Sequence, residues 1–115
     1  MTERRWVRVT APDNIPLREG RAVSIDGRDV AIFNLGDRFL AADNRCPHRG
    51  GPLCDGMVTG SSVVCPLHAW KIDLESGAVQ RPASEANRCV ESYATRIEDG
   101  IVCVEVPWHG AEDAA

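Results

Sequence analysis

Two short segments that combine cysteine and histidine, Cys46-Pro47-His48 and Cys65-Pro66-Leu67-His68, decide the fold of this chain of 115 residues. Sixteen residues, 49–64, separate them. Each segment supplies one thiolate and one imidazole, which are metal ligands, and a proline beside each cysteine stiffens the backbone. Gly50 and Gly51 let the backbone approach a buried group closely. The pattern predicts four metal ligands carried by two loops.

The order of these ligands, Cys-His and then Cys-His, bears on the kind of metal. Two thiolates with two imidazoles suit either zinc or the iron–sulfur cluster in which histidine replaces cysteine on one iron. Common zinc fingers pair the two cysteines in one knuckle and the two histidines on a helix. Here each loop has one of each, which places the cysteines at one level and the histidines nearer the loop tips, and this fits two metal positions. A structural zinc module that mediates protein contacts is the remote alternative.

The sequence on either side of these segments is typical of β-structure. Short runs rich in Val and Ile recur between turn residues, and helical periodicity is nearly absent. Turn dipeptides predict three hairpins: Asp26-Gly27 between 21–25 and 29–33, Gly36-Asp37 between 30–35 and 38–42, and Asp99-Gly100 between 93–98 and 101–106. The middle, 43–83, holds four of the seven prolines and is predicted to be rich in loops.

The two segments, with Arg49 and Gly50 after the first, resemble the Rieske 2Fe-2S signature. The resemblance implies an all-β fold, with a Rieske-type antiparallel β-sandwich framework and a loop-rich cluster-binding subdomain. The length of 115 residues indicates one compact domain, over 1–107, with cluster-binding loops over about 44–72, and we expect a flexible tail over 108–115. The resemblance also implies one Rieske-type 2Fe-2S cluster per chain, with Cys46 and Cys65 on the inner iron and His48 and His68 on the outer iron.

The chain departs from the respiratory-type Rieske proteins at four positions. Those proteins have an extra disulfide between the two loops, and here the two places are Gly51 and Leu67. Trp70 and Ile72 stand where those proteins have hydroxyl donors to the cluster. Fewer hydrogen bonds stabilise the reduced cluster less, so we expect a midpoint potential in the low part of the range of about −150 to +300 mV.

Three segments indicate a partner: 44–53, 65–71 and 93–100 resemble the Rieske-type small subunit of assimilatory NAD(P)H nitrite reductase. That resemblance implies a large partner subunit with FAD, a 4Fe-4S cluster and siroheme, which reduces nitrite to ammonium. The alternative is a Rieske ferredoxin that passes electrons from a ferredoxin reductase to a ring-hydroxylating dioxygenase. In both cases the chain passes single electrons and has no catalytic residues of its own.

The composition argues against nucleic-acid binding, a membrane helix and a disulfide-rich fold. The net charge is −4, and 12 of the 13 basic residues are Arg, so there is no Lys-rich patch for nucleic acid. No stretch approaches the roughly 18 apolar residues of a membrane helix, and no secretory signal is recognisable, so we expect a soluble cytoplasmic protein. An odd number of cysteines, five, argues against a disulfide framework. We expect Cys54 to be a small loop residue and Cys89 and Cys103 to be small apolar residues of the strands.

Overall fold

The residues that the structure describes fold into short strands with three single-turn 3-10 helices. The computed structural model describes residues 3–47, 50–67 and 69–108. The elements are β1 (Glu3–Thr10), η1 (Pro12–Asn14), β2 (Gly20–Ile25), β3 (Arg28–Asn34), β4 (Phe39–Asp43), η2 (Leu53–Asp55), β5 (Met57–Thr59), β6 (Ser62–Val64), β7 (Lys71–Asp73), β8 (Val79–Arg81), η3 (Ala83–Glu85), β9 (Ser92–Tyr93), β10 (Thr95–Glu98) and β11 (Ile101–Trp108). The all-β prediction is confirmed.

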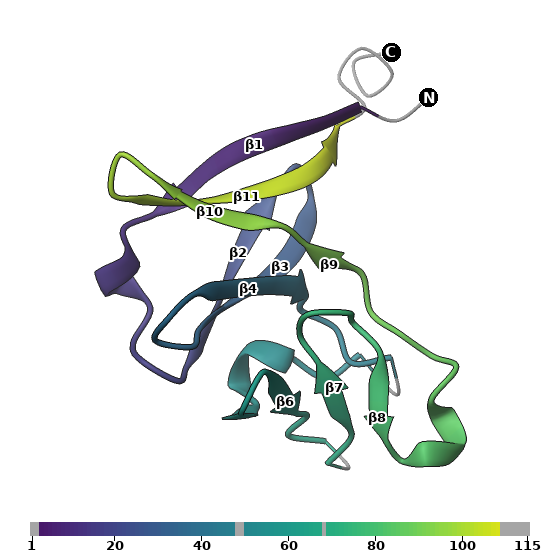
Figure 1. Ribbon diagram of the computed structural model, residues 1–115. Coiled ribbons are helices and arrows are strands. Elements are labelled where there is room, and N and C mark those ends of the chain that lie inside the picture. Colours follow the sequence, from purple (N-terminus) through teal and green to yellow (C-terminus); the bar gives the residue numbers. More distant parts are fainter. Residues whose placement is uncertain (1–2, 48–49, 68, 109–115) are drawn as a thin grey trace.

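The strands form three antiparallel sheets, shown in Figure 1. The outer sheet has the order β1-β11-β10, and the central sheet has the order β2-β3-β4-β9. The small sheet, β5-β6-β7-β8, lies at the far side of the central sheet from the outer sheet (Figure 1). The outer and central sheets make the predicted sandwich framework, and the small sheet belongs to the segment that contains both cysteine loops.

All three predicted hairpins are present. They join β2 to β3, β3 to β4 and β10 to β11. The run 93–98 differs in one respect, because it divides at Ala94 into two strands in different sheets. Tyr93 pairs with Ala41 of the central sheet, whereas Thr95 pairs with Val104 of the outer sheet. The chain therefore crosses between the two layers of the sandwich at this point.

Two parts of the sheet structure have no counterpart in the sequence prediction. β1 pairs along its length with β11, for example Val7 with Val104, although the two strands lie at opposite ends of the chain. The middle of the chain is rich in loops, as predicted, and it also contains the four-stranded small sheet, which the sequence did not indicate. Each of its strands has only three residues, too few to show a periodic pattern.

The central sheet is buried on both faces because it lies between two hydrophobic cores. Val30 and Ile32 of β3 point into the core shared with the outer sheet. Ala31 and Phe33, the alternate residues, point into the core shared with the small sheet. This explains why 30–33 is an uninterrupted apolar run, since a strand covered on both faces has no solvent side. The core shared with the small sheet also contains Cys46 and Cys65.

Candidate metal centre

The first cysteine loop begins where β4 ends, and Asn44 anchors it. The Asn44 side chain is buried; its Oδ1 accepts a hydrogen bond from the Cys54 N–H at 2.7 Å and its Nδ2 donates to Asp29 Oδ2 at 3.2 Å. The Asn44 backbone N–H donates to the Asp29 carbonyl at 2.8 Å. One side chain thus joins the central sheet, the start of the loop and η2. Sequence reasoning missed Asn44, because an asparagine next to a strand is equally common in an ordinary turn.

The first loop closes on itself beside Cys46. The Cys46 N–H donates to the Gly51 carbonyl at 2.8 Å, and the Gly50 N–H donates to the Cys46 carbonyl at 2.8 Å. Gly50 has a φ of 71°, a left-handed conformation that suits glycine. The closure brings Cys46 and Gly51 together.

The second loop, between β6 and β7, closes with the same spacing. The Cys65 N–H donates to the Trp70 carbonyl at 2.7 Å, five residues ahead, as Cys46 does to Gly51. The Cys65 Sγ also accepts a weak hydrogen bond from the Leu67 N–H at 3.4 Å. Trp70 is buried in the core below, with the Arg88 guanidinium 5.8 Å from its ring centroid. Trp70 therefore belongs to the same hydrophobic core as Cys65.

The two loops meet at Gly51 and the two cysteines. A Cβ placed on Gly51 would lie 3.1 Å from the Cys65 Sγ and 3.0 Å from Leu67 Cδ1. Both cysteines have only 2% of their surface exposed, and neither forms a disulfide. The positions that respiratory-type Rieske proteins bridge with a disulfide, Gly51 and Leu67, are thus neighbours here.

Electrostatics around the two thiols suit a metal. Burial raises the pKa of the Cys65 thiol to about 11; the hydrogen bond from Leu67 opposes this, and the neighbouring Cys46 thiol adds to it. Iron binds the thiolate, and a bound cation supplies the positive charge that a buried thiolate needs. The two buried thiols lie side by side, on two loops that are each closed by a backbone hydrogen bond to the residue five positions ahead. This arrangement fits the inner iron of a 2Fe-2S cluster. The other two predicted ligands, His48 and His68, lie outside the described residues.

The other cysteines are placed differently from this pair. Cys54 is half-buried in η2, where its Sγ lies 3.7 Å from Asp55 Oδ1, and burial raises the pKa of its thiol. Cys103 is buried in β11, as predicted. The prediction for Cys89 is wrong: its side chain is exposed, and Cys89 lies outside the named strands, at an isolated bridge with Ala78.

A hydrogen-bond network supports the end of β4 just before the first loop. The Tyr93 hydroxyl donates to Asp43 Oδ1 at 2.5 Å and lies 3.5 Å from the Arg28 guanidinium, which donates to it. Burial, together with the bond to Asp43, raises the pKa of Tyr93 well above its ordinary value. Tyr93 belongs to the β9 segment that crosses between the two sheets, so the network ties this crossing to the strand that leads into Cys46.

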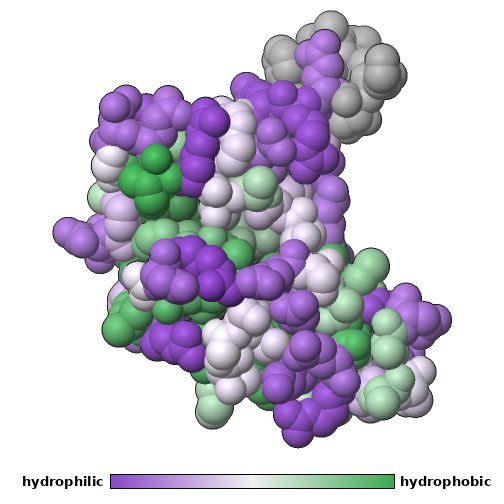
Figure 2. Space-filling model, in the orientation of Figure 1, coloured by the Kyte–Doolittle hydropathy of each residue, from purple (hydrophilic) through white to green (hydrophobic). Residues whose placement is uncertain are grey.

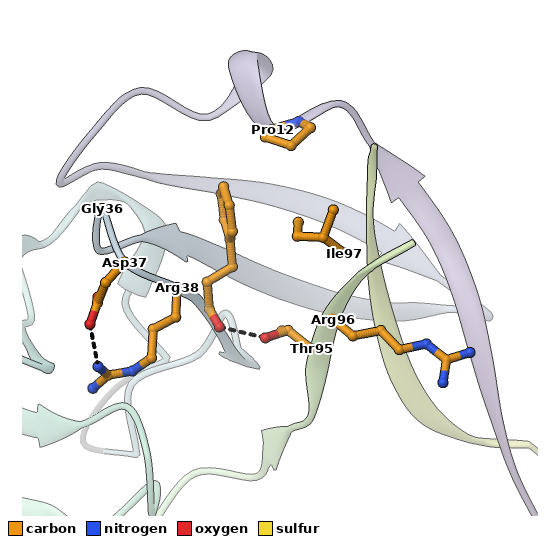
Figure 3. A pocket seen from close by; sticks show the side chains of 8 residues that line it. Pro12, Gly36, Asp37, Arg38, Thr95, Arg96 and Ile97 are labelled. Carbon is orange, nitrogen blue, oxygen red and sulfur yellow. Dashed lines mark hydrogen bonds and ion pairs between the residues drawn. The ribbon is translucent and has the colours of Figure 1, made fainter. Parts of the chain in front are cut away.

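A pocket of about 440 Å³ lies between the outer and central sheets, away from the two loops in sequence. Figure 3 shows Pro12 and Ile97 on either side of it, and Figure 2 shows the apolar surface between β10 and β4. The charged groups at its rim bind neighbouring carboxylates: Arg38 pairs with Asp37 at 3.1 Å, and Arg96 pairs with Glu98 at 2.7 Å. None of the residues that line this pocket comes from the loops 44–52 or 65–70.

Comparison with known proteins gives a consistent result for the family. Residues 5–94 match the Rieske [2Fe-2S] domain. The chain is 28% identical over 107 residues to the ferredoxin component of a naphthalene 1,2-dioxygenase system of Pseudomonas aeruginosa, covering 92% of this chain and 99% of that protein. It is 34% identical over 92 residues to the 3-phenylpropionate/cinnamic acid dioxygenase ferredoxin subunit of Shigella flexneri, covering 77% of this chain and 84% of that one.

Among solved structures, similar ones include a Mycobacterium tuberculosis protein assigned as the small subunit of an NADH-dependent nitrite reductase. Its TM-score is 0.81 at 24% identity, covering 90% of this chain and 96% of that chain. The chain described here belongs to the Rieske [2Fe-2S] family and carries a Rieske-type 2Fe-2S cluster. Its role is electron transfer. Within the described residues, no helix is long and apolar enough to cross a membrane.

Proposed function

We propose that this chain transfers single electrons as the small subunit of an assimilatory NAD(P)H-dependent nitrite reductase. Its cluster is held by Cys46 and Cys65 on the inner iron and by His48 and His68 on the outer iron. The observation that carries electron transfer is the pair of buried thiols, Cys46 and Cys65, on two loops closed by the same hydrogen bond. The domain extends over 1–107, and the protein is cytoplasmic.

Different parts of the chain would support the cluster in different ways. The cluster supplies one-electron oxidation and reduction of iron. The core below the loops, including Trp70 and Leu53, keeps water from the thiolate side. The loop closures and the Asn44 anchor hold the two thiols at a fixed separation. A rigid site lowers the reorganisation that accompanies each electron transfer.

The assignment to nitrite reductase is supported by the segments 44–53, 65–71 and 93–100, which resemble the small subunit of that enzyme. A second candidate is the ferredoxin component of a ring-hydroxylating dioxygenase system. It is favoured by the curated relatives, of which the Shigella flexneri protein at 34% identity is a dioxygenase ferredoxin subunit. The two candidates share the same chemistry at the cluster and differ in the protein that accepts the electron.

The partner is tested by anaerobic pull-down of the tagged chain from the source cell grown on nitrate. We expect a co-eluting protein with the absorption bands of siroheme and flavin, and oxidation of the reduced Rieske cluster when nitrite is added. Co-elution of a large oxygenase with a second Rieske cluster and mononuclear iron, and no response to nitrite, would contradict the proposal. That outcome would support the dioxygenase ferredoxin instead.

A further inference from the structure

One row of residues crosses the exposed face of the small sheet. Backbone pairing places Met57 opposite Val64, Val64 opposite Lys71, and Lys71 opposite Arg81. Side chains of directly paired residues lie on the same face of a sheet. Val63 and Ile72 alternate with Val64 and Lys71, and both are buried in the core. Val79, which pairs with Ile72, is also buried, whereas Arg81 is exposed, because the β-bulge in β8 shifts the register between them. The docking row, as we call Met57, Val64, Lys71 and Arg81, therefore faces outward.

The two cations of the docking row differ from nine of the other ten basic residues that the structure describes, because those nine bind a carboxylate or a carbonyl. Arg18 donates to the Gly60 carbonyl. Eight arginines pair with carboxylates, namely Arg4, Arg5, Arg8, Arg21, Arg28, Arg38, Arg88 and Arg96. Within the described part of the chain, the side chains of Lys71, Arg81 and Arg45 make no such bond. Arg45 lies elsewhere, beside Arg28 and Asp43 in a separate cleft.

Lys71 and Arg81 also stand directly opposite one another, next to a β-bulge in the β7–β8 ladder. Like charges opposite each other destabilise a sheet. The acid that follows on the same face of β7, Asp73, forms no ion pair with either cation among the described residues; its carboxylate instead accepts bonds from the Ser76 hydroxyl at 2.8 Å and the Glu75 N–H at 3.2 Å. A pair of like charges that lowers the stability of the sheet is expected where a negatively charged group of another molecule binds and compensates it.

The docking row lies beside the second cysteine loop. Val64 and Lys71 form the last pair of the β6–β7 hairpin, and the loop 65–70 that carries Cys65 starts and ends on them. The apolar members of this region are unusually exposed: Met57 has 72% of its surface exposed and Leu67, in the loop itself, has 44%. The region therefore combines exposed apolar side chains with two cations next to the cluster-binding loop.

We propose that the docking row and Leu67 form the surface that binds the redox partner, and that the partner presents an acidic patch to Lys71 and Arg81 beside an apolar one facing Met57 and Leu67. This deepens the proposed function and rests on it. A folded protein fits better than a small anion, because exposed apolar groups beside charged ones are the composition of a protein interface. The flexible thioether of Met57 suits contact with another protein's surface.

The test uses Arg81→Glu, which turns the like-charge pair into an opposite-charge pair with Lys71. Stability should be retained or raised, and the cluster absorption spectrum should be unchanged. The probes are two purified proteins, the siroheme subunit and the terminal oxygenase of the source cell. We expect the second-order rate constant for electron transfer from the reduced chain to the accepting protein to fall by about tenfold or more at low ionic strength. At about 1 M salt, where screening is strong, the difference should largely disappear.

Arg8→Glu is the matched control, since it changes the net charge equally on an exposed side chain of the outer sheet. Its rate constant should stay close to that of the unmodified chain. Met57→Ser should also slow the transfer, with a loss that persists at high salt. The inference is overturned if Arg81→Glu leaves the rate unchanged, raises it, or lowers it only as much as Arg8→Glu does.

The same experiment separates this inference from the function on which it rests. Electron acceptance by the oxygenase and not by the siroheme subunit overturns the nitrite reductase assignment, and the variants still test the docking row against the oxygenase. Acceptance by neither protein overturns both.

Discussion

Replacing Gly51 by alanine should destabilise the bound cluster, although the side chain gains only a methyl group. The added Cβ would lie 3.1 Å from the Cys65 Sγ, 3.0 Å from Leu67 Cδ1 and 3.1 Å from Leu67 Cγ. Apolar atoms in ordinary contact lie about 3.5–4.0 Å apart. The Leu67 side chain is partly exposed and can move away, but the Cys65 Sγ cannot move without shifting a proposed ligand of the cluster.

The size of the effect follows from the cost of overpacking, which is about 1–3 kcal/mol in a well-packed site. Such a cost corresponds to a factor of about 5 to 150 in an equilibrium constant. Because it falls on the cluster-bound arrangement of the two loops, the rate at which the cluster is lost should rise by up to that factor.

The assay is the loss of visible absorbance when the purified protein is mixed with an iron chelator under anaerobic conditions. Gly60→Ala is the matched control, since the same Cβ there meets no atom within 4 Å. Gly60 has a φ of 59°, so this control costs about 1–2 kcal/mol of backbone strain and lowers global stability, but it should leave the bleaching rate unchanged. Urea unfolding measures that stability separately.

A second variant separates the two contacts. Gly51→Ala with Leu67→Ala removes the contact with Leu67 and keeps the contact with Cys65, so bleaching should remain faster than in the unmodified protein. The reasoning is refuted if Gly51→Ala bleaches at the original rate, or if the double variant returns fully to that rate.

Four further outcomes are expected. Cys46→Ser should abolish the 2Fe-2S absorption spectrum, whereas Cys54→Ser, which changes the half-buried cysteine of η2, should keep it. A full spectrum in Cys46→Ser would disprove the ligand assignment. Asn44→Ala should lower the free energy of unfolding in urea by about 1–3 kcal/mol, because the Cys54 N–H loses its acceptor, and an unchanged midpoint would contradict this anchor. The pKa of Tyr93 is raised in the folded state, so its contribution to stability is present below the unfolded pKa of about 10 and is lost as the pH rises above it. Tyr93→Phe should therefore lose less stability at alkaline pH than the unmodified protein. The tyrosinate absorbance follows the titration directly, because the chain has a single tyrosine. Potentiometric titration should give a midpoint in the low part of the Rieske range, and a value above about +150 mV would contradict the argument from missing hydrogen-bond donors.

Several features of the fold could be predicted from local sequence because their cause is local. Asp26-Gly27 and Asp99-Gly100 specify tight turns through the positive φ of their residues, which is 51° at Asp26 and 80° at Gly27. The hairpins at these turns were therefore predictable. The ligand candidates could be predicted for a similar reason, since cysteine and histidine at short spacing on two loops have few uses other than binding metal.

Other features depend on contacts between distant parts of the chain. The three-residue strands of the small sheet are stabilised by the core they share with Phe33 and Leu53, so their own sequence carries little signal. The pairing of β1 with β11 joins the two ends of the domain, and no local rule specifies it.

The sequence by itself determined the chemistry of this protein, because ligand identity and spacing lie within two short segments. Only the tertiary structure decided the surroundings of that chemistry. It showed that Gly51 lies against the Cys65 Sγ, that Asn44 joins the first loop to η2, and that Lys71 faces Arg81 beside the second loop. The physical reason is that each of these contacts joins residues from separate strands or loops, and their approach is set by packing and strand register, which no single segment of the chain encodes.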